Sequence, residues 1–223
     1  MKIHFSNETN KVYNMDCIKG LKDIPDSSVD LIVTDPPYGI SYSSNYYKTK
    51  NPHKKIINDE VLFIPLDELW RILKPNGAMF VFYSHKVPLI DERIKNNIIW
   101  VKNNWTAGDL TGNFGNQYEC IAFLPKGGFK IRGKRWSNVW NFDRISADKL
   151  KHPTQKPCSI IRRIIKCSSD EGMLVLDPFM GSGTTAVVAK ELNREFIGFE
   201  IEKDYFKIIN ERLSQTNLKG NFL

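Results

Sequence analysis

One group of residues that could do chemistry is the run Asp35-Pro36-Pro37-Tyr38, which directly follows a short apolar stretch. Proline has no backbone N–H, so this turn offers backbone carbonyls and one carboxylate, all of which accept hydrogen bonds. Such a lining suits a ligand group that donates hydrogen bonds, such as an amine, and Tyr38 adds a flat face for a planar ring. A purely structural turn is the alternative interpretation.

A second group is the run from Asp177 to Thr185, in which the glycines Gly181 and Gly183 stand two residues apart. This spacing lets the backbone approach a ligand and direct amide N–H groups at it from a helix start. No lysine stands where a phosphate-binding loop needs one, whereas a dinucleotide fingerprint, with Ala186 at its third glycine position, stays open. Glu200 ends the next apolar run, where an acid can accept hydrogen bonds from ribose hydroxyls, so a cofactor that carries a nucleoside is predicted.

Both groups depend on a framework in which strands alternate with helices. Each group follows a short apolar segment that contains β-branched residues and is typical of a buried strand. Strand, helix and strand in close succession predict an α/β fold with a doubly wound, mostly parallel sheet. The expected strands are Val29 to Thr34, Ala78 to Tyr83, Met173 to Leu176 and Glu195 to Phe199, and the expected helices are Thr184 to Asn193 and Lys203 to Leu213.

Length and composition indicate one sizeable core with inserted loops. The 223 residues include 32 Lys and Arg against 25 Asp and Glu, and the net charge of +7 favours an anionic partner such as nucleic acid. With 41% apolar residues the chain can build a core, so wholesale disorder is excluded. No apolar run reaches the ~18 residues of a membrane span, and the polar N-terminus lacks a secretory signal, so a cytoplasmic location without a membrane partner is expected.

The four cysteines are expected to be core or helix thiols. Cys17, Cys120, Cys158 and Cys167 lie far apart, without a C-x-x-C pair and without a histidine at metal-ligand spacing. No metal site is therefore predicted, and a zinc site or a disulfide is the alternative.

The region between Ile98 and Lys156 differs from the rest, because tryptophans and glycines are frequent and the helical period is lost. We expect an inserted lobe, in which the segment from Lys126 to Trp136 combines basic and aromatic residues suited to phosphate contacts and base stacking. A second such stretch, from Tyr46 to Lys55, is placed to close over a site, although solvated surface loops are the alternative for both. The basic residues expected to contact nucleic acid are Lys48, Lys50, Lys54, Lys55, Lys130, Arg132, Lys134 and Arg135.

The motifs taken together resemble a known family. The tetrad 35–38, the segment from His152 to Pro157 and the loop from Gly181 to Thr185 closely resemble the S-adenosylmethionine-dependent DNA amino-methyltransferases. The order, with the catalytic motif first and the cofactor loop near the end, is similar to the permuted beta group, and the resemblance extends from about Val12 to Leu213. It implies a Rossmann-like methyltransferase domain with a catalytic part at residues 1–102, a target-recognition insertion at 103–150 and a cofactor-binding part at 151–223.

The resemblance also implies roles for individual residues. Lys156 would lie near the methionine carboxylate of S-adenosylmethionine, Glu200 would bind the ribose, and Asp16 would lie beside the adenine, although an N-cap is the alternative for Asp16. The implied catalytic residues are Asp35, Pro36, Pro37 and Tyr38, and the implied cofactor-binding residues are Asp16, Cys17, Lys156, Asp177, Phe179, Gly181, Ser182, Gly183, Thr184 and Glu200.

The implied reaction is transfer of a methyl group to the exocyclic N6 amine of adenine in duplex DNA, after the base has flipped out of the helix. Asp35 and the Pro36 carbonyl would accept the amine hydrogens and stabilise the positive charge that grows during transfer. Asp at the first motif position resembles the adenine enzymes more than the cytosine enzymes. Alternatives are cytosine N4, an RNA substrate or a nucleic-acid-binding protein without catalysis, and a cognate restriction endonuclease and a homodimer are further expected partners.

Overall fold

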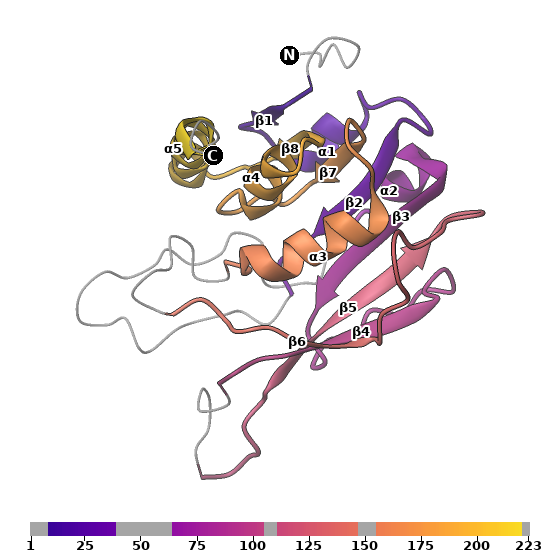
Figure 1. Cartoon of the computed structure of the whole chain (residues 1–223), viewed down its shortest axis with the longest axis vertical. Coiled ribbons are helices and arrows are strands. Elements are labelled where there is room, and N and C mark those ends of the chain that lie inside the picture. The colour runs from indigo at the N-terminus through magenta and orange to yellow at the C-terminus, as the bar shows by residue number, and fades with distance from the viewer. Residues whose placement is uncertain (1–8, 39–63, 105–110, 147–154, 220–223) are drawn as a thin grey trace.

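The computed structural model describes residues 9–38, 64–104, 111–146 and 155–219, which form one twisted sheet covered by helices (Figure 1). The strands are β1 (Lys11–Tyr13), β2 (Val29–Thr34), β3 (Leu73–Tyr83), β4 (Asn96–Val101), β5 (Tyr118–Pro125), β6 (Val139–Asn141), β7 (Leu174–Asp177) and β8 (Glu195–Phe199). The helices are α1 (Cys17–Leu21), α2 (Leu66–Ile72), α3 (Cys158–Ser168), α4 (Thr184–Glu191) and α5 (Lys203–Lys219).

The strand order is β1-β8-β7-β2-β3-β5-β4-β6. From β1 to β3 all neighbours are parallel, whereas β5 runs antiparallel to both β3 and β4. The chain leaves β2 towards β3 on one side and leaves β7 towards β8 on the other, so the order reverses between β2 and β7. Such a reversal opens a crevice at the carboxyl ends of the two strands. The prediction of a doubly wound, mostly parallel sheet is confirmed.

The central strands β2 and β7 are mostly apolar and buried, because both faces of the sheet are covered. Helices α3, α4 and α5 pack on one face, where Leu31 and Val33 of β2 meet Ile164 of α3 in the core. Helices α1 and α2 pack on the other face, where Ile32 meets Leu69. Adjacent residues of a strand point to opposite faces, so β2 serves both layers of the core.

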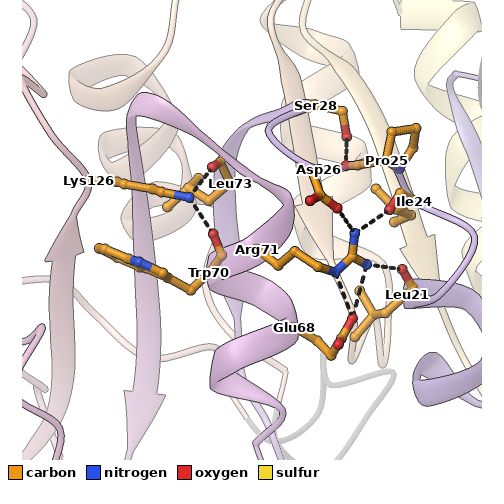
Figure 2. Close-up of polar contacts among 10 residues, drawn as sticks. All are labelled: Leu21, Ile24, Pro25, Asp26, Ser28, Glu68, Trp70, Arg71, Leu73 and Lys126. Atoms are coloured by element: carbon orange, nitrogen blue, oxygen red, sulfur yellow. Dashed lines mark hydrogen bonds and ion pairs between the residues drawn. The ribbon is translucent and has the colours of Figure 1, made fainter.

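Arg71 of α2 fixes the connection between α1 and β2 (Figure 2). Its guanidinium donates hydrogen bonds to the carbonyls of Leu21 and Ile24, each at 3.0 Å, and pairs with Asp26 and Glu68. One planar group with five donors thereby satisfies backbone carbonyls that follow a short helix. The entry to β2, and with it the position of the strand end that carries Asp35, is set by this network.

Lys126, directly after β5, caps the carboxyl end of α2 (Figure 2). Its ammonium donates to the carbonyls of Trp70 at 2.6 Å and Leu73 at 2.7 Å, which the end of the helix leaves without helical partners. Because Leu73 is also the first residue of β3, the same ammonium fixes the start of that strand. Lys126 therefore has a structural role.

Several expected boundaries differ from those observed. β3 begins at Leu73 rather than Ala78. Inside this strand Asn76 has a positive φ of +72°, and the pairing of β3 with β2 shifts register over the same stretch. The expected insertion at 103–150 contains β5 and β6, which are members of the same sheet, because β5 lies between β3 and β4. A separate target-recognition region at 103–150 stays a prediction.

All four cysteines have free thiols, and Cys17, Cys120 and Cys167 are buried, as expected for core thiols. Among the residues that the structure describes, no group of His, Cys, Asp and Glu side chains is arranged to hold a metal ion. Within the same residues, no helix combines the length and the apolar character that crossing a membrane requires.

Candidate active site

An open pocket lies at the carboxyl ends of β2 and β7, the neighbouring strands that carry the two predicted groups. Its empty volume, which includes the open mouth, is about 430 Å³. The pocket brings Asp35 together with six of the residues expected to bind a cofactor. Its lining comprises Val33, Thr34, Asp35, Phe82, Gln155, Lys156, Ile161, Asp177, Phe179, Met180, Gly181, Ser182, Thr184 and Thr185.

Asp177 at the end of β7 organises the loop that leads into α4. Its carboxyl group accepts hydrogen bonds from the backbone N–H of Phe179 at 3.0 Å and from the Thr185 hydroxyl at 2.7 Å. Burial of this side chain raises the pKa of Asp177 to about 8, so the group can hold a proton at neutral pH. Asp177 therefore spans the loop and fixes the first turn of α4 against the strand end.

The two glycines of the loop adopt left-handed backbone conformations, with φ of +54° at Gly181 and +79° at Gly183. A Cβ at Gly183 would lie 3.0 Å from the side chain of Ile209, so a larger residue would be both strained and crowded. The Gly181 N–H donates to Glu200 at 2.7 Å and the Gly183 N–H donates to the Met180 carbonyl at 2.8 Å. Contrary to the expectation, these two amides are already used within the protein rather than directed at the pocket.

Glu200 lies at the end of β8, as expected, and is buried. One carboxylate oxygen accepts from the Gly181 N–H and the other from the Glu202 N–H at 2.8 Å. Burial raises the pKa of Glu200 to about 7. The side chain does not belong to the pocket lining, so its role at the ribose stays a prediction.

Asp16 and Cys17 lie at the start of α1 and do not line the pocket. Asp16 is the N-cap of α1 and accepts a hydrogen bond from the Ile18 N–H at 2.9 Å, which is the alternative that the sequence left open. Burial raises the pKa of the Cys17 thiol to about 12. Cofactor contact by these two residues stays a prediction.

The turn of residues 35–38 holds Asp35 with both carboxylate oxygens engaged. The Tyr38 hydroxyl donates to Oδ1 at 2.6 Å, and the Lys156 ammonium lies 2.7 Å from Oδ2. Pro36 is buried and Pro37 is half-buried, so the turn is packed rather than free in solvent. The structure thus places the acceptor-rich turn of residues 35–38 at the pocket, with a lysine beside it.

Lys156 is expected near a cofactor carboxylate, and the structure pairs it with carboxylates of the protein. Besides Asp35, its ammonium lies 3.2 Å from Glu119 Oε2 and donates to the Tyr38 hydroxyl at 3.1 Å. Glu119 in turn lies 3.3 Å from Lys102. Lys156 also lines the pocket, so contact with a cofactor stays a prediction alongside these observed pairs.

Glu119 is a site residue that the sequence reasoning missed. It lies on β5, in a strand that is otherwise largely apolar and that fell within the expected insertion. An acidic residue in such a strand was the available signal, because a half-buried carboxylate needs a cation nearby. Which cation it meets depends on β5 lying beside β3, and this could not be inferred from local sequence.

The charges of this cluster influence one another's protonation. Burial raises the pKa of Asp35 even though Lys156 acts against it. Burial alone would raise the pKa of Glu119, but Lys156 and Lys102 outweigh it and lower the value. Burial alone would lower the pKa of Lys156, but Asp35 and Glu119 outweigh it and raise the value, so the lysine is charged.

The basic segment expected to contact nucleic acid lies away from the pocket. Arg132 lies beside the C-terminal end of α3, where its N–H donates to the Cys167 carbonyl at 2.8 Å and its guanidinium pairs with Asp170 at 3.2 Å. The N-terminal end of α3 borders the pocket, so the segment is at the opposite edge of the sheet (Figure 1). Lys130, Lys134 and Arg135 are exposed there, and Lys48, Lys50, Lys54 and Lys55 lie outside the described residues.

Comparison with known proteins gives the family. The sequence model of a family described as DNA methylase matches residues 29–211. The chain is 34% identical to the type II methyltransferase M2.DpnII of Streptococcus pneumoniae, over 97% of this chain and 94% of that protein. It is 33% identical to the DNA adenine methyltransferase YhdJ of Escherichia coli (strain K12), over 94% of this chain and 84% of that protein.

Solved structures share the fold. The crystal structure of the M1.HpyAVI–SAM complex covers 91% of this chain and 99% of its own, with a TM-score of 0.67 and 27% identity. The cytosine-N4-specific PvuII DNA methyltransferase has a TM-score of 0.70 at 18% identity, over 92% of this chain and 86% of its own, which shows the fold alone. Because the family match spans most of the residues and relatives above 30% identity extend over nearly the whole length, the chain belongs to the DNA methylase family.

Proposed function

We propose that this protein transfers a methyl group from S-adenosylmethionine to the N6 amine of adenine in duplex DNA. The observation that carries the proposal is the position of Asp35, whose carboxyl group lines one pocket together with residues of the β7–α4 loop. Family membership and relatives named as type II or adenine methyltransferases support the reaction and the base. The M1.HpyAVI structure, a complex with SAM, supports the cofactor.

The residues of the pocket fit S-adenosylmethionine. Thr34 Oγ1 is buried in the lining and has no hydrogen-bond partner among the described residues, so it is open to a polar group of a ligand. Phe179 and Met180 supply apolar contacts, while Gly181 and Ser182 supply the close backbone approach. When bound, S-adenosylmethionine supplies a methyl group on a sulfonium, which is an electrophile that needs no activation by a metal.

Asp35 is the group that makes the amine reactive. The lone pair of an aromatic exocyclic amine is delocalised into the ring, so an acceptor that takes its hydrogens favours attack. As the nitrogen becomes positive during transfer, the Asp35 carboxylate stabilises the charge and can take the proton that the nitrogen then releases. Tyr38 contacts Asp35 directly, so its ring lies within reach of a base that binds there and is the proposed stacking partner.

A flipped base enters from the carboxyl edge of the sheet, where the pocket opens, so the duplex is proposed to approach this edge. Lys86, just after β3, and Arg144, just after β6, are exposed there and can contact phosphates. Contacts from the four basic residues expected at 130–135 belong to the proposal as well, although they lie farther from the pocket. The proposal includes target recognition by residues 103–150, a cytoplasmic location, a cognate restriction endonuclease and a homodimer.

Transfer of tritiated methyl groups from S-adenosylmethionine to unmethylated duplex DNA tests the reaction, with Asp35→Ala as the inactive control. Nucleoside mass spectrometry of the product is expected to show N6-methyladenine. N4-methylcytosine would move the proposal to the cytosine enzymes, and labelling of RNA in place of DNA would change the substrate. No incorporation on DNA of varied sequence would overturn the proposal.

A further inference from the structure

Four charged side chains of alternating sign form a chain that ends at the catalytic carboxylate. Lys102 lies 3.3 Å from Glu119, Glu119 lies 3.2 Å from Lys156, and Lys156 lies 2.7 Å from Asp35. The four come from segments far apart in sequence. Lys102 follows β4, Glu119 lies on β5, Lys156 precedes α3 and Asp35 follows β2. A chain assembled from so many elements by the fold is a built arrangement rather than a local surface pair.

The inner members of the chain are shielded from water. The side chain of Lys156 is 7% exposed, that of Asp35 is 19% exposed and that of Glu119 is 24% exposed. An ammonium in such surroundings needs a counter-ion, because breaking a buried ion pair leaves a charge that neither solvent nor protein compensates. The rings of Tyr38 and Phe82, whose centroids lie 5.4 Å and 5.2 Å from the Lys156 ammonium, give only partial compensation.

Each carboxylate oxygen of Asp35 already has a donor in this arrangement. Oδ1 accepts from Tyr38 and Oδ2 is paired with Lys156. On the proposed function, a target amine must donate to this carboxylate and competes for its remaining lone pairs with the two donors already present. If Lys156 gives way, its charge must be received elsewhere.

Glu119 has the free capacity to receive it. Its Oε1 is paired with Lys102, whereas its Oε2 lies within ion-pair distance of Lys156 but has no directed hydrogen bond. A small movement of the ammonium away from Asp35 would turn this contact into a full charge-assisted hydrogen bond. We infer that Glu119 is a positioning residue that takes up the Lys156 ammonium when the target amine binds to Asp35.

This inference rests on the proposed function and gives Glu119 and Lys102 separate tasks. Lys102 pairs with Oε1 of Glu119 and keeps this carboxylate ionised. Glu119 holds the Lys156 ammonium within the site while Asp35 accepts hydrogen bonds from the substrate amine. Without the Glu119 charge, Asp35 is the one carboxylate of the described residues that remains within ion-pair distance of Lys156, so the lysine competes with the amine for it. The substrate base then binds more weakly, while the cofactor pocket formed by the β7–α4 loop is left as it was.

The test compares Glu119→Gln with the wild-type chain, on duplex DNA that carries a site identified by sequencing of methylated bases. Glutamine keeps the size of the side chain and removes its charge. We expect the methyl-transfer rate at subsaturating DNA to fall by about 10- to 100-fold, mainly through a higher KM for DNA, with cofactor affinity measured by calorimetry unchanged within about twofold. Glu119→Asp, which keeps the charge, should recover part of the loss.

The pH profile separates positioning from mere support of the fold. The charged or titratable groups around Asp35 are Tyr38, Lys156 and Glu119, with Asp177 nearby and Lys102 beyond Glu119. Glu119 raises the pKa of Asp35, so its neutralisation should move the acid limb of the rate to lower pH. A variant that only loosened the fold would lower the melting temperature and leave that limb in place.

Asp30→Asn is the matched control, because Asp30 is a half-buried carboxylate of the same sheet that pairs with Lys74 at 2.8 Å, far from the pocket. It should leave the rate and the profile unchanged. Wild-type rates and an unmoved acid limb in Glu119→Gln would overturn the inference while the proposed function stands, and so would an equal fall in rate in Asp30→Asn. No transfer by the wild-type chain would remove the proposed function and this inference with it.

Discussion

The ends of β2 and β7 are alike in sequence and differ in what surrounds their carboxyl groups. Both strands end in Asp-Pro, and they are parallel neighbours in the sheet. Asp177 is satisfied by a backbone amide and a hydroxyl within eight residues of it, whereas Asp35 is paired with a cation from a distant segment. The same dipeptide therefore yields a carboxyl group that builds a loop in one strand and a carboxyl group that lines the pocket beside a lysine in the other.

The largest effect is expected from Asp35→Asn. The amide removes the negative charge that stabilises the methylated nitrogen and places an N–H₂ donor towards Lys156, so the transfer rate should fall by about 10²–10³-fold or more. Single-turnover methyl transfer measures this rate. Cofactor affinity, measured by calorimetry, should change by less than about twofold, and an equal loss of affinity would mean that the two strand ends do not have separate tasks.

The glycine loop should show the reverse pattern in Gly183→Val. The residue has φ of +79° and a Cβ would meet Ile209 at 3.0 Å, so the loop must shift and cofactor affinity should fall by about tenfold or more. Gly172→Ala is a matched control, because Gly172 has φ of +76° but no neighbour within 4 Å of the added atom. It should cost ~1–2 kcal/mol of stability and leave cofactor affinity intact. Equal loss of affinity in both variants would contradict this account of the loop.

The positions of both strand ends could be predicted from sequence, because short apolar runs followed by Asp-Pro identify buried strands and their carboxyl edge. Parallel pairing then brings Asp35 and Asp177 to the same edge without further information. The glycines at 181 and 183 were likewise visible, since their left-handed backbone is a local property.

The charge chain behind Asp35 could not be predicted in the same way. Glu119 reaches the site because β5 inserts antiparallel between β3 and β4, and Lys156 finds two carboxylates that are remote in sequence. The basic segment at 126–136 is predicted from its composition to contact nucleic acid, which stays a prediction, and composition does not give its position. Its actual place is set by packing on α3, where Arg163 lies over the rings of Trp136 and Phe142.

The pH dependence of stability should distinguish the two strand ends further. The pKa of Asp177 is about 8 in the folded chain against 3.8 as the ordinary value, so the folded state binds a proton that the unfolded state has lost between these values. The contribution of this group to the stability of the cofactor-free chain should therefore be highest below about pH 4. The free energy of unfolding should then fall as the pH rises towards 8, by up to about 1.4 kcal/mol per pH unit.

Asp177→Asn tests this directly, because asparagine resembles the protonated acid and cannot lose the proton. Urea unfolding between pH 5 and pH 8 should show a shallower fall of stability than in the wild-type chain, so that the difference between the two chains grows as the pH rises. Glu200, whose pKa is about 7, contributes with the same sign and accounts for a remaining slope. An unaltered slope in the variant would show that Asp177 is ionised in the fold, as the proposed function requires of Asp35.

The smallest effect is expected from the exposed basic residues, for which the chain offers two matched pairs. Lys86 and Arg144 follow β3 and β6 towards the carboxyl edge of the sheet, whereas Lys134 and Arg135 precede β6 in the segment that packs on α3 through Trp136. Removing a side chain that binds one phosphate should reduce the slope of log affinity against log salt by about one. We expect Lys86→Gln with Arg144→Gln to flatten the slope by about two, and Lys134→Gln with Arg135→Gln to flatten it by less, with transfer rates at saturating DNA retained in both. A larger change of slope in the second pair would mean that the duplex runs along α3, because only then would the distant charges meet more phosphates than those beside the catalytic strand end.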